Sequence, residues 1–314
     1  MTLLTIGFPY TADRFGGSNA SSLVLARALQ DGGHRVRILS HGGDGRVAEE
    51  ARTLGLSVAR LPALSGVPGY ARPDRFRVEQ LTAFRAARRA IGALSLDIVH
   101  TNDLTMLRAW AMPALAARVP LIAHWRSNFR ESWSVKAGLH AAAKVIAVSG
   151  YSFNKLPAWV RRKGVVEFNA FDLNITPAER LTARVRLRQR LDLPPGAAIV
   201  GVFGNHIVRK RTHVLADVLA DVTATADGRP VFGLACGGRA EPYDHELDSK
   251  IAAFGLEQRL LRPGFVRPVE DWMAGCDAIL APAIDEPLAR NVLEAMALEI
   301  PAIVSTDGGL PELV

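Results

Sequence analysis

The chain has 314 residues, of which 49% are hydrophobic, so it is long enough to bury the cores of two domains. No apolar run reaches the roughly 18–20 residues of a membrane-spanning helix, and the first residues carry neither the basic segment nor the cleavage site of a signal peptide. The two cysteines, Cys236 and Cys276, lie in separate apolar segments, which indicates core packing in a reducing compartment. We therefore expect a cytoplasmic protein.

The net charge is +7 and the sequence pI is near 9.8, a balance that can attract nucleic acid, anionic lipid or phosphorylated metabolites. No zinc-ligand spacing, aromatic–basic RNA motif or helix-turn-helix signal is present, so a nucleic-acid partner is not expected. The clearest basic segment, residues 72–94, has apolar residues at helical spacing with arginines between them. It predicts an amphipathic helix that covers a sheet. A helix that also contacts an anionic membrane surface is the alternative.

Short segments rich in valine and isoleucine alternate with helical segments along the whole chain. Strands of the first half are predicted at residues 2–8, 35–40, 56–62, 97–102, 120–125, 144–150 and 165–170. Helices between them include residues 18–33 and 104–118. The second half restarts the pattern, with strands predicted at residues 197–205, 230–238, 259–266, 277–283 and 301–306. This alternation predicts βαβ units and parallel sheets.

The polar segment 172–197, which contains Pro-Pro-Gly near its end, is the predicted junction between two units. We therefore predict an α/β fold of two facing, Rossmann-like, doubly wound domains, residues 1–172 and residues 173–314. Ligands of such sheets bind outside the C-terminal strand ends, and a cleft between two domains is a natural site. The second domain stops soon after its fifth strand, so we expect it to be truncated.

Two segments at strand ends have the chemistry to meet a phosphate. Gly16 and Gly17 precede a helix whose expected N-cap is Ser18 or Asn19, and a helix N-terminus presents free N–H groups to an anion. An ordinary glycine turn is the alternative. The basic turn 209–211 follows the first strand of the second half, where its charges oppose the helix dipole. A polyanionic ligand would account for them, and a solvated basic turn fits equally well.

The segment 284–297, IDEPLARNVLEAMA, places Glu286 before a predicted helix and a partly exposed Glu294 about two turns inside it. Pro287 suits the first helical position because its missing N–H would be unsatisfied there. The N–H groups then free for a phosphate belong to Leu288, Ala289 and Arg290. A carboxylate can accept two O–H bonds from vicinal hydroxyls. The segment therefore predicts a nucleotide sugar, with the sugar near Glu286 and the ribose near Glu294; a Glu294 that only complements the helix dipole is the alternative.

Glu286 and Glu294 are separated by seven residues and followed by LEAMALEIPAIVSTDGGLPELV, with RKR, GFV and DAILAPA before them in that order. In the first half the segments GGSNASSLVLARALQDGGHRV, DIVHTN, PLIAHW, VIAVSGYS and FNAFD complete the pattern. In these motifs nearly the whole chain resembles the retaining GT-B glycosyltransferases of family four. The resemblance implies a nucleotide-sugar donor as substrate, no resident cofactor and no metal ion, in keeping with the absence of an Asp-x-Asp motif in a suitable loop.

By this resemblance Glu286 would hold the donor sugar, Glu294 the ribose and Lys210 the diphosphate, and His124 would face the donor sugar. Further predicted donor-binding residues, from the resemblance or from the free N–H groups, are Gly17, Arg209, Val266, Leu288, Ala289 and Arg290. The sequence departs from the family at Asn205, where an arginine is usual, and at Ala289, where a glycine is usual. We expect Arg209 or Arg211 to supply the missing charge.

The first domain would receive the acceptor, a glycan, a lipid-linked sugar or a small molecule of the cell envelope. Its basic helix leads us to expect weak contact with an anionic membrane at its inner face. Two alternatives stay open: another nucleotide-sugar enzyme of the same fold, such as an epimerase or a phosphorylase, and a degenerate, non-catalytic binding protein.

Overall fold

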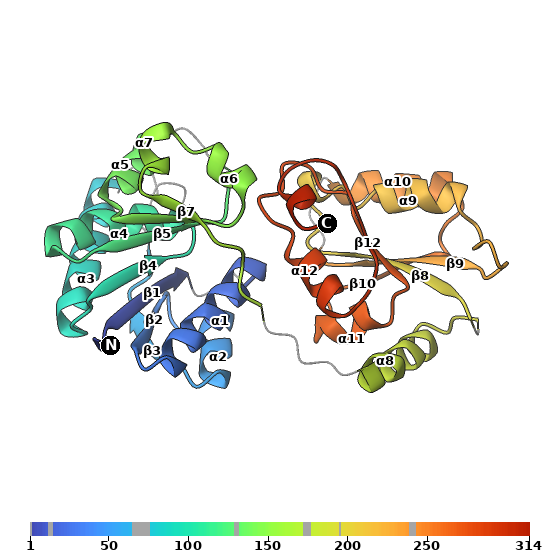
Figure 1. The fold of residues 1–314 in the computed structure, drawn as a ribbon, viewed down its shortest axis with the longest axis horizontal. Coiled ribbons are helices and arrows are strands. Elements are labelled where there is room, and N and C mark those ends of the chain that lie inside the picture. The colour runs from blue at the N-terminus through green and yellow to red at the C-terminus, as the bar shows by residue number, and fades with distance from the viewer. Residues whose placement is uncertain are drawn as a thin grey trace. The chain divides into compact units, whose positions relative to one another are not determined.

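A computed structural model of the chain describes residues 2–11, 15–64, 76–128, 132–171, 177–194, 196–238 and 243–314. The chain divides into two compact units, Met1–Phe171 and Asp172–Val314. Each unit is built around one parallel sheet (Figure 1). The predicted α/β class with two doubly wound sheets is confirmed.

The first unit has a seven-stranded sheet in the order β3-β2-β1-β4-β5-β6-β7. Its strands are β1 (Thr5–Thr11), β2 (Arg35–His41), β3 (Ser57–Leu61), β4 (Ile98–Thr101), β5 (Leu121–Trp125), β6 (Lys144–Ala147) and β7 (Gly164–Val166). Its helices are α1 (Gly17–Asp31), α2 (Arg46–Thr53), α3 (Phe76–Ala93), α4 (Leu104–Ala117), α5 (Trp133–Ala141), α6 (Gly150–Asn154) and α7 (Ala158–Arg161). The seven predicted strands are confirmed. The central strand β1 is buried along nearly its whole length and reads as an apolar run.

The second unit has a five-stranded sheet in the order β10-β9-β8-β11-β12. Its strands are β8 (Ala198–Phe203), β9 (Val231–Cys236), β10 (Leu260–Gly264), β11 (Ala278–Ala281) and β12 (Ala302–Val304), all five as predicted. Its helices and 3₁₀ turns are α8 (Pro177–Arg190), η1 (Val208–Lys210), α9 (Val214–Asp221), α10 (Tyr243–Ala253), α11 (Val269–Ala274), α12 (Arg290–Ala297) and η2 (Leu310–Glu312).

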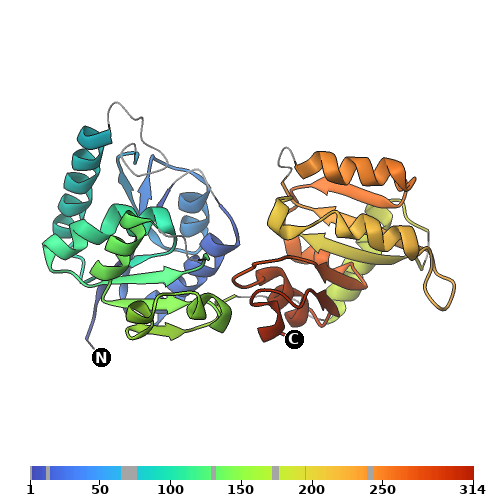
Figure 2. The same ribbon diagram turned by 90° about the horizontal axis from the view of Figure 1, so that it is seen from above.

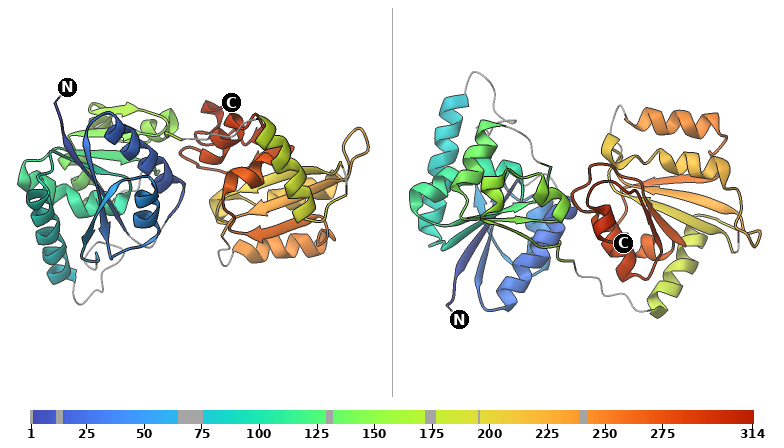
Figure 3. Two further views of the ribbon diagram at one scale, coloured as in Figure 1. Left: turned by 90° about the horizontal axis from the view of Figure 1, so that it is seen from below. Right: turned by 45° about the horizontal axis from the view of Figure 1, so that its top comes forward.

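Both sheets are covered by helices on both faces, as Figures 2 and 3 show. In the first unit Phe8 and Leu23 belong to the core beneath α1, whereas Trp110 and Trp125 belong to the core beneath α4. The second unit also has one core on each face. Cys236 and Cys276 are free and buried there, so their predicted packing role is confirmed. Burial raises the pKa of the Cys236 thiol to about 12.

Helix α8 lies in the segment predicted as a polar junction, and it packs on the second sheet. Its residue Leu187 is buried in the core. Arg184 and Arg188 bind the two oxygens of Asp277 at 2.6 Å and 2.7 Å. These two arginines therefore attach a covering helix to its sheet.

Strand order reverses between β1 and β4 in the first sheet and between β8 and β11 in the second. Ligands of doubly wound sheets bind at such reversals, outside the C-terminal strand ends. Two candidate regions follow, one in each unit. No helix in the described part of the chain has the length and apolar character needed to cross a membrane.

Candidate functional site

Glu286 lies in the loop between β11 and α12, and only 6% of its surface is exposed. Its Oε2 atom lies 3.0 Å from Lys210 Nζ and also pairs with Arg209. Both cations belong to η1, the turn that follows β8. These ion pairs therefore connect the ends of the two strands at which the strand order reverses. A carboxylate is costly to bury unless it is paired, by several kcal/mol, and the two cations offset that cost.

The backbone around Glu286 is fixed by the segment that follows β12. The N–H of Gly309 donates to the Glu286 carbonyl at 2.8 Å. Gly308 has a φ of +71°, and a Cβ there would lie 2.6 Å from Glu286 O and 2.8 Å from Glu286 N. Only glycine fits this close approach in a left-handed conformation. In addition, the N–H of Ile284 donates to the Arg209 carbonyl at 2.9 Å, which joins the loop to η1.

Helix α12 begins later than predicted, at Arg290, with Ala289 as an extended N-cap residue. A helix starting at Pro287 would need the Glu286 carbonyl to accept the N–H of Arg290. That carbonyl instead accepts from Gly309. The expectation that Pro287 opens the helix is therefore wrong, and the Glu286 carbonyl is bonded to a residue distant in sequence.

Three further predictions for this segment change with the helix start. Leu288 and Ala289 lie in the loop, with 6% and 1% of their surfaces exposed, instead of in the first helical turn. Glu294 lies about one turn, not two, inside the helix. It is also buried, at 8% exposure, and not partly exposed.

Glu294 is held by its own helix. Its Oε1 atom lies 2.6 Å from Arg290 Nε, four residues earlier. Burial raises the pKa of Glu294, and the opposing charge of Arg290 lowers it. Arg290 thus has a side-chain partner that the sequence reasoning did not assign to it.

Asn291 of α12 forms a hydrogen bond to the end of β8, beside the strand-order reversal of the second sheet. Its Nδ2 atom donates to the carbonyl of Phe203, the last residue of β8, at 3.1 Å. The sequence reasoning missed Asn291. Arg209, one of the two candidates for the missing positive charge, pairs with Glu286.

Two further predicted donor-binding residues, Val266 and Gly17, lie in different units. Val266 follows β10 and packs, half-buried, against the core of the second unit. Gly17 is exposed as the first residue of α1, whose N-cap is Gly16 instead of Ser18 or Asn19. The Asn19 side chain accepts from the Gly16 N–H at 3.2 Å. Asn19 therefore stabilises the helix start from the third helical position, as in a capping box.

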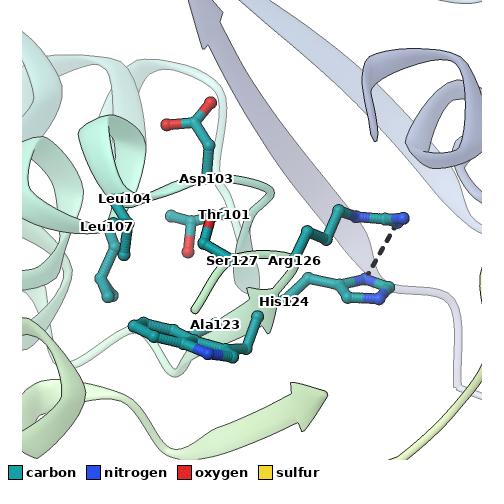
Figure 4. A pocket seen from close by; sticks show the side chains of 9 residues that line it. Thr101, Asp103, Leu104, Leu107, Ala123, His124, Arg126 and Ser127 are labelled. Carbon is teal, nitrogen blue, oxygen red and sulfur yellow. Dashed lines mark hydrogen bonds between the residues drawn. The ribbon is translucent and has the colours of Figure 1, made fainter. Parts of the chain in front are cut away.

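His124 lies near the end of β5 in the first unit, with 6% of its surface exposed. Its Nδ1 atom is 3.2 Å from His100 Nε2. The same atom is 3.3 Å from Arg126 Nη2 (Figure 4). Burial lowers the pKa of His100 to about 3, and the charge of Arg126 adds to this effect. Burial, Arg126 and His100 likewise lower the pKa of His124. His100 lies in the motif DIVHTN, but the sequence reasoning predicted no role for it or for Arg126.

A small pocket adjoins His124 and is drawn in Figure 4. Its lining residues are Thr101, Asp103, Leu104, Leu107, Ala123, His124, Trp125, Arg126 and Ser127. It lies at the ends of β4 and β5, at the same edge of the sheet as the reversal point. In the described ranges of the chain, no group of three or more His, Cys, Asp or Glu side chains could hold a metal ion.

Two doubly wound sheets with polar residues gathered at the strand-order reversals define a class of two-domain α/β proteins that bind ligands at these edges. The profile described as Glycosyltransferase Family 4 matches residues 15–192, and the profile described as Glycosyl transferases group 1 matches residues 195–314. The chain therefore belongs to the glycosyltransferases of family 4, as the sequence resemblance indicated.

Individual relatives agree with this assignment. Over 135 residues the chain is 30% identical to the lipopolysaccharide core biosynthesis mannosyltransferase LpsB of Rhizobium meliloti (strain 1021), a match that spans 42% of this chain and 38% of LpsB. The structure of HepE from Anabaena in complex with UDP and glucose is similar in fold, with a TM-score of 0.80 and 23% identity over 99% of this chain and 83% of HepE.

A glycosyltransferase from Rickettsia africae is similar as well, with a TM-score of 0.79 and 20% identity over 99% of this chain and 82% of that chain. These likenesses, together with the profile matches, confirm the predicted GT-B fold class.

Gly308→Ala tests whether the segment after β12 holds Glu286. We expect a loss of about 2–4 kcal/mol in the free energy of unfolding, since the new Cβ adds left-handed strain and a clash with the Glu286 backbone. Gly255→Ala is the matched control: its φ is +62° and a Cβ there meets nothing within 4 Å, so about 1–2 kcal/mol is expected. Urea unfolding measures both, and equal losses would show that Gly308 does not support Glu286.

Proposed function

We propose that this protein is a retaining glycosyltransferase that moves a hexosyl or related sugar from a nucleotide-sugar donor to an acceptor, without a metal ion. The observation that carries this proposal is the pair of buried glutamates, Glu286 and Glu294, each paired with basic side chains at the ends of β8 and β11. Membership of family 4 supports the transfer activity. The likeness in fold to HepE, which has been observed with UDP-glucose, supports the donor class.

The donor diphosphate would bind Arg209, Lys210 and the N–H groups at the start of α12, where a helix N-terminus favours an anion. Its phosphates would then replace Glu286 as the partner of the two cations. The released Glu286 carboxylate would accept hydroxyls of the sugar, and Glu294 would accept those of the ribose, through charge-assisted hydrogen bonds.

The other donor-binding residues have lesser roles in this proposal. The N–H groups of Leu288 and Ala289 would line the approach to the phosphates, and Arg290 would orient Glu294. Val266 would lie near the base, and Gly17 would let the loop before α1 approach the donor.

In the transfer step the bond between the sugar C1 and the phosphate oxygen breaks, and a bond from the acceptor oxygen to C1 forms. The leaving diphosphate gains negative charge, which Lys210 and Arg209 would stabilise electrostatically. The departing phosphate oxygen would take the proton of the acceptor hydroxyl on the same face. No protein nucleophile is needed.

The competing candidates are another nucleotide-sugar enzyme of this fold and a degenerate protein that binds without catalysis. Asn205, which stands where the family usually has an arginine, favours the degenerate protein. Arg209 argues against a degenerate protein, because this residue brings a second cation to Glu286. Transfer or hydrolysis of radiolabelled nucleotide sugars distinguishes the three functions.

The donor is tested with a thermal-shift panel of UDP-, GDP- and ADP-sugars, because a ligand that binds only the native state stabilises it by RT ln(1 + [L]/Kd). One nucleotide class should raise Tm, and Glu294→Ala should weaken its affinity by about tenfold to hundredfold through loss of a charge-assisted bond. Glu257→Ala, an exposed glutamate of the same unit, is the control. Unchanged affinity of Glu294→Ala in calorimetry would rule out the ribose role.

Lys210→Ala should lower kcat by about tenfold to hundredfold more than it lowers donor affinity, because the diphosphate gains charge only as the bond breaks. The matched control is Arg211→Ala, which removes the same charge from the next residue, on the side of His213. Steady-state kinetics and calorimetry together provide the comparison. Equal losses in affinity and in kcat would mean that Lys210 only anchors the ground state.

For the acceptor we propose a lipid-linked glycan at an anionic membrane surface. LpsB, the relative described above, is named for lipopolysaccharide core biosynthesis. In the first unit, Arg85, Arg88 and Arg89 are exposed on α3, and Leu81 of the same helix is 48% exposed. Residues 72–75 of the predicted basic helix lie outside the described residues. Each basic side chain near such a surface contributes about 1 kcal/mol, which salt screens.

Cosedimentation with anionic vesicles tests this acceptor proposal. We expect weak binding at low salt, lost at high salt and reduced by Arg85→Glu with Arg88→Glu. The control is the double variant Arg162→Glu with Arg186→Glu, which removes the same net charge from exposed positions outside α3. This control should bind the vesicles nearly as the parent protein does. If neither protein binds at low salt, the acceptor is to be sought among soluble sugars.

A further inference from the structure

The contacts of His124 fix which of its ring nitrogens carries the proton. An arginine side chain has only N–H donors, so the 3.3 Å contact from Arg126 Nη2 requires His124 Nδ1 to accept. His100 Nε2, 3.2 Å from the same atom, must then carry a proton as well. A neutral imidazole whose Nδ1 accepts carries its own proton on Nε2. His124 is therefore the Nε2–H tautomer.

Protonation of Nδ1 is opposed by the same neighbours. A proton there would point at two N–H donors, one of them on a cation. Burial, together with Arg126 and His100, accordingly lowers the pKa of His124. The ring thus remains neutral, and its one N–H is on Nε2.

The Nε2 atom of His124 is buried, and it has no hydrogen-bond partner among the residues that the structure describes. An unsatisfied buried donor costs about 1–3 kcal/mol, and such groups are rare in native proteins. His124 lies beside the reversal point of the sheet, where ligands bind. An oxygen atom of a ligand would satisfy this donor.

We propose that Arg126 and His100 are positioning residues that hold His124 as the Nε2–H tautomer, so that His124 donates a hydrogen bond to an oxygen of the donor sugar. In the transfer step His124 then neither takes nor gives a proton. The identity of the ligand rests on the proposed function. The tautomer does not, because it follows from contacts within the ligand-free chain.

A second buried histidine, His41, serves as an internal reference because it has the opposite tautomer. Trp110 Nε1 donates to His41 Nε2 at 3.0 Å, and His41 Nδ1 lies 2.8 Å from the carbonyl of Pro62. An indole nitrogen is a donor only and a carbonyl is an acceptor only. His41 is therefore the Nδ1–H tautomer, with both ring nitrogens satisfied.

The tautomers are read directly by long-range ¹H–¹⁵N correlation spectra of the full chain labelled with ¹⁵N-histidine, without ligand. We expect His124 to show a protonated Nε2 and an unprotonated Nδ1, and His41 to show the reverse. Spectra of His124→Gln and His41→Gln assign the two rings. A protonated Nδ1 in His124 would overturn the proposal whatever the activity.

Two substitutions of His124 separate the nitrogens, because the glutamine amide nitrogen lies near the position of Nε2 and the asparagine one near that of Nδ1. His124→Gln should keep affinity for the nucleotide sugar within about tenfold, whereas His124→Asn should lose about tenfold to hundredfold. Both should bind the nucleoside diphosphate without a sugar as the parent does. Equal affinities of the two variants for the nucleotide sugar would overturn the proposal.

The positioning residues are tested by conservative rescue. His100→Gln keeps an N–H that can donate to His124 Nδ1, and His100→Leu does not. We expect His100→Leu and Arg126→Met to raise the donor KM about tenfold, with a smaller change in kcat, and His100→Gln to remain near the parent. Equal KM values for the Gln and Leu variants, each with a parent-like Tm, would overturn the positioning role. If the parent binds no nucleotide sugar, the proposed function fails, and the spectra still decide the tautomer.

Discussion

The second unit is organised around one buried carboxylate, Glu286. Its side chain is neutralised by two cations from the turn after β8, and its carbonyl is taken by Gly309 after β12. The strands β8, β11 and β12 are neighbours in the sheet, so Glu286 joins the C-terminal ends of three adjacent strands. Since an unpaired buried charge costs several kcal/mol, these loops cannot rearrange independently. The same contacts that hold the loops in place also set the charge pattern of the candidate site.

The sequence was sufficient for the sheets and insufficient for the details of the site. Strands such as β1 and β8, which are buried along nearly their whole length, carry their signal in consecutive apolar residues that can be read locally. The loop before α12 is instead bonded to a distant segment, since the Glu286 carbonyl accepts from a glycine beyond the next strand. No local pattern around Pro287 encodes that contact. The burial of Glu294 was missed for the same reason, since tertiary packing determines which face of a short helix is covered.

The histidines of the first unit show the same limit. His41 ends β2 after ILS, and His124 follows LIA in β5, so the two have similar local sequences and both are buried. His41 nevertheless carries its proton on Nδ1, because Trp110 donates to its Nε2 atom. His124 carries its proton on Nε2, because Arg126 donates to its Nδ1 atom. A resemblance to a family could single out His124. Only the structure could identify Arg126 and His100 as the residues that determine its hydrogen bonding.

The two units present different polar chemistry at their strand ends. The second unit has charged groups that are already paired with one another, Lys210 with Glu286 and Arg290 with Glu294. A bound diphosphate would therefore exchange ion pairs and would not add new ones. In the proposed function this exchange would favour the ligand, because a diphosphate brings more negative charge than a single carboxylate, and it would release Glu286 for the sugar hydroxyls. The first unit offers a neutral N–H from His124, which suits a hydroxyl oxygen without attracting a competing anion. In the proposed function, then, the cations of the second unit select the diphosphate and the neutral donor of the first unit selects the sugar.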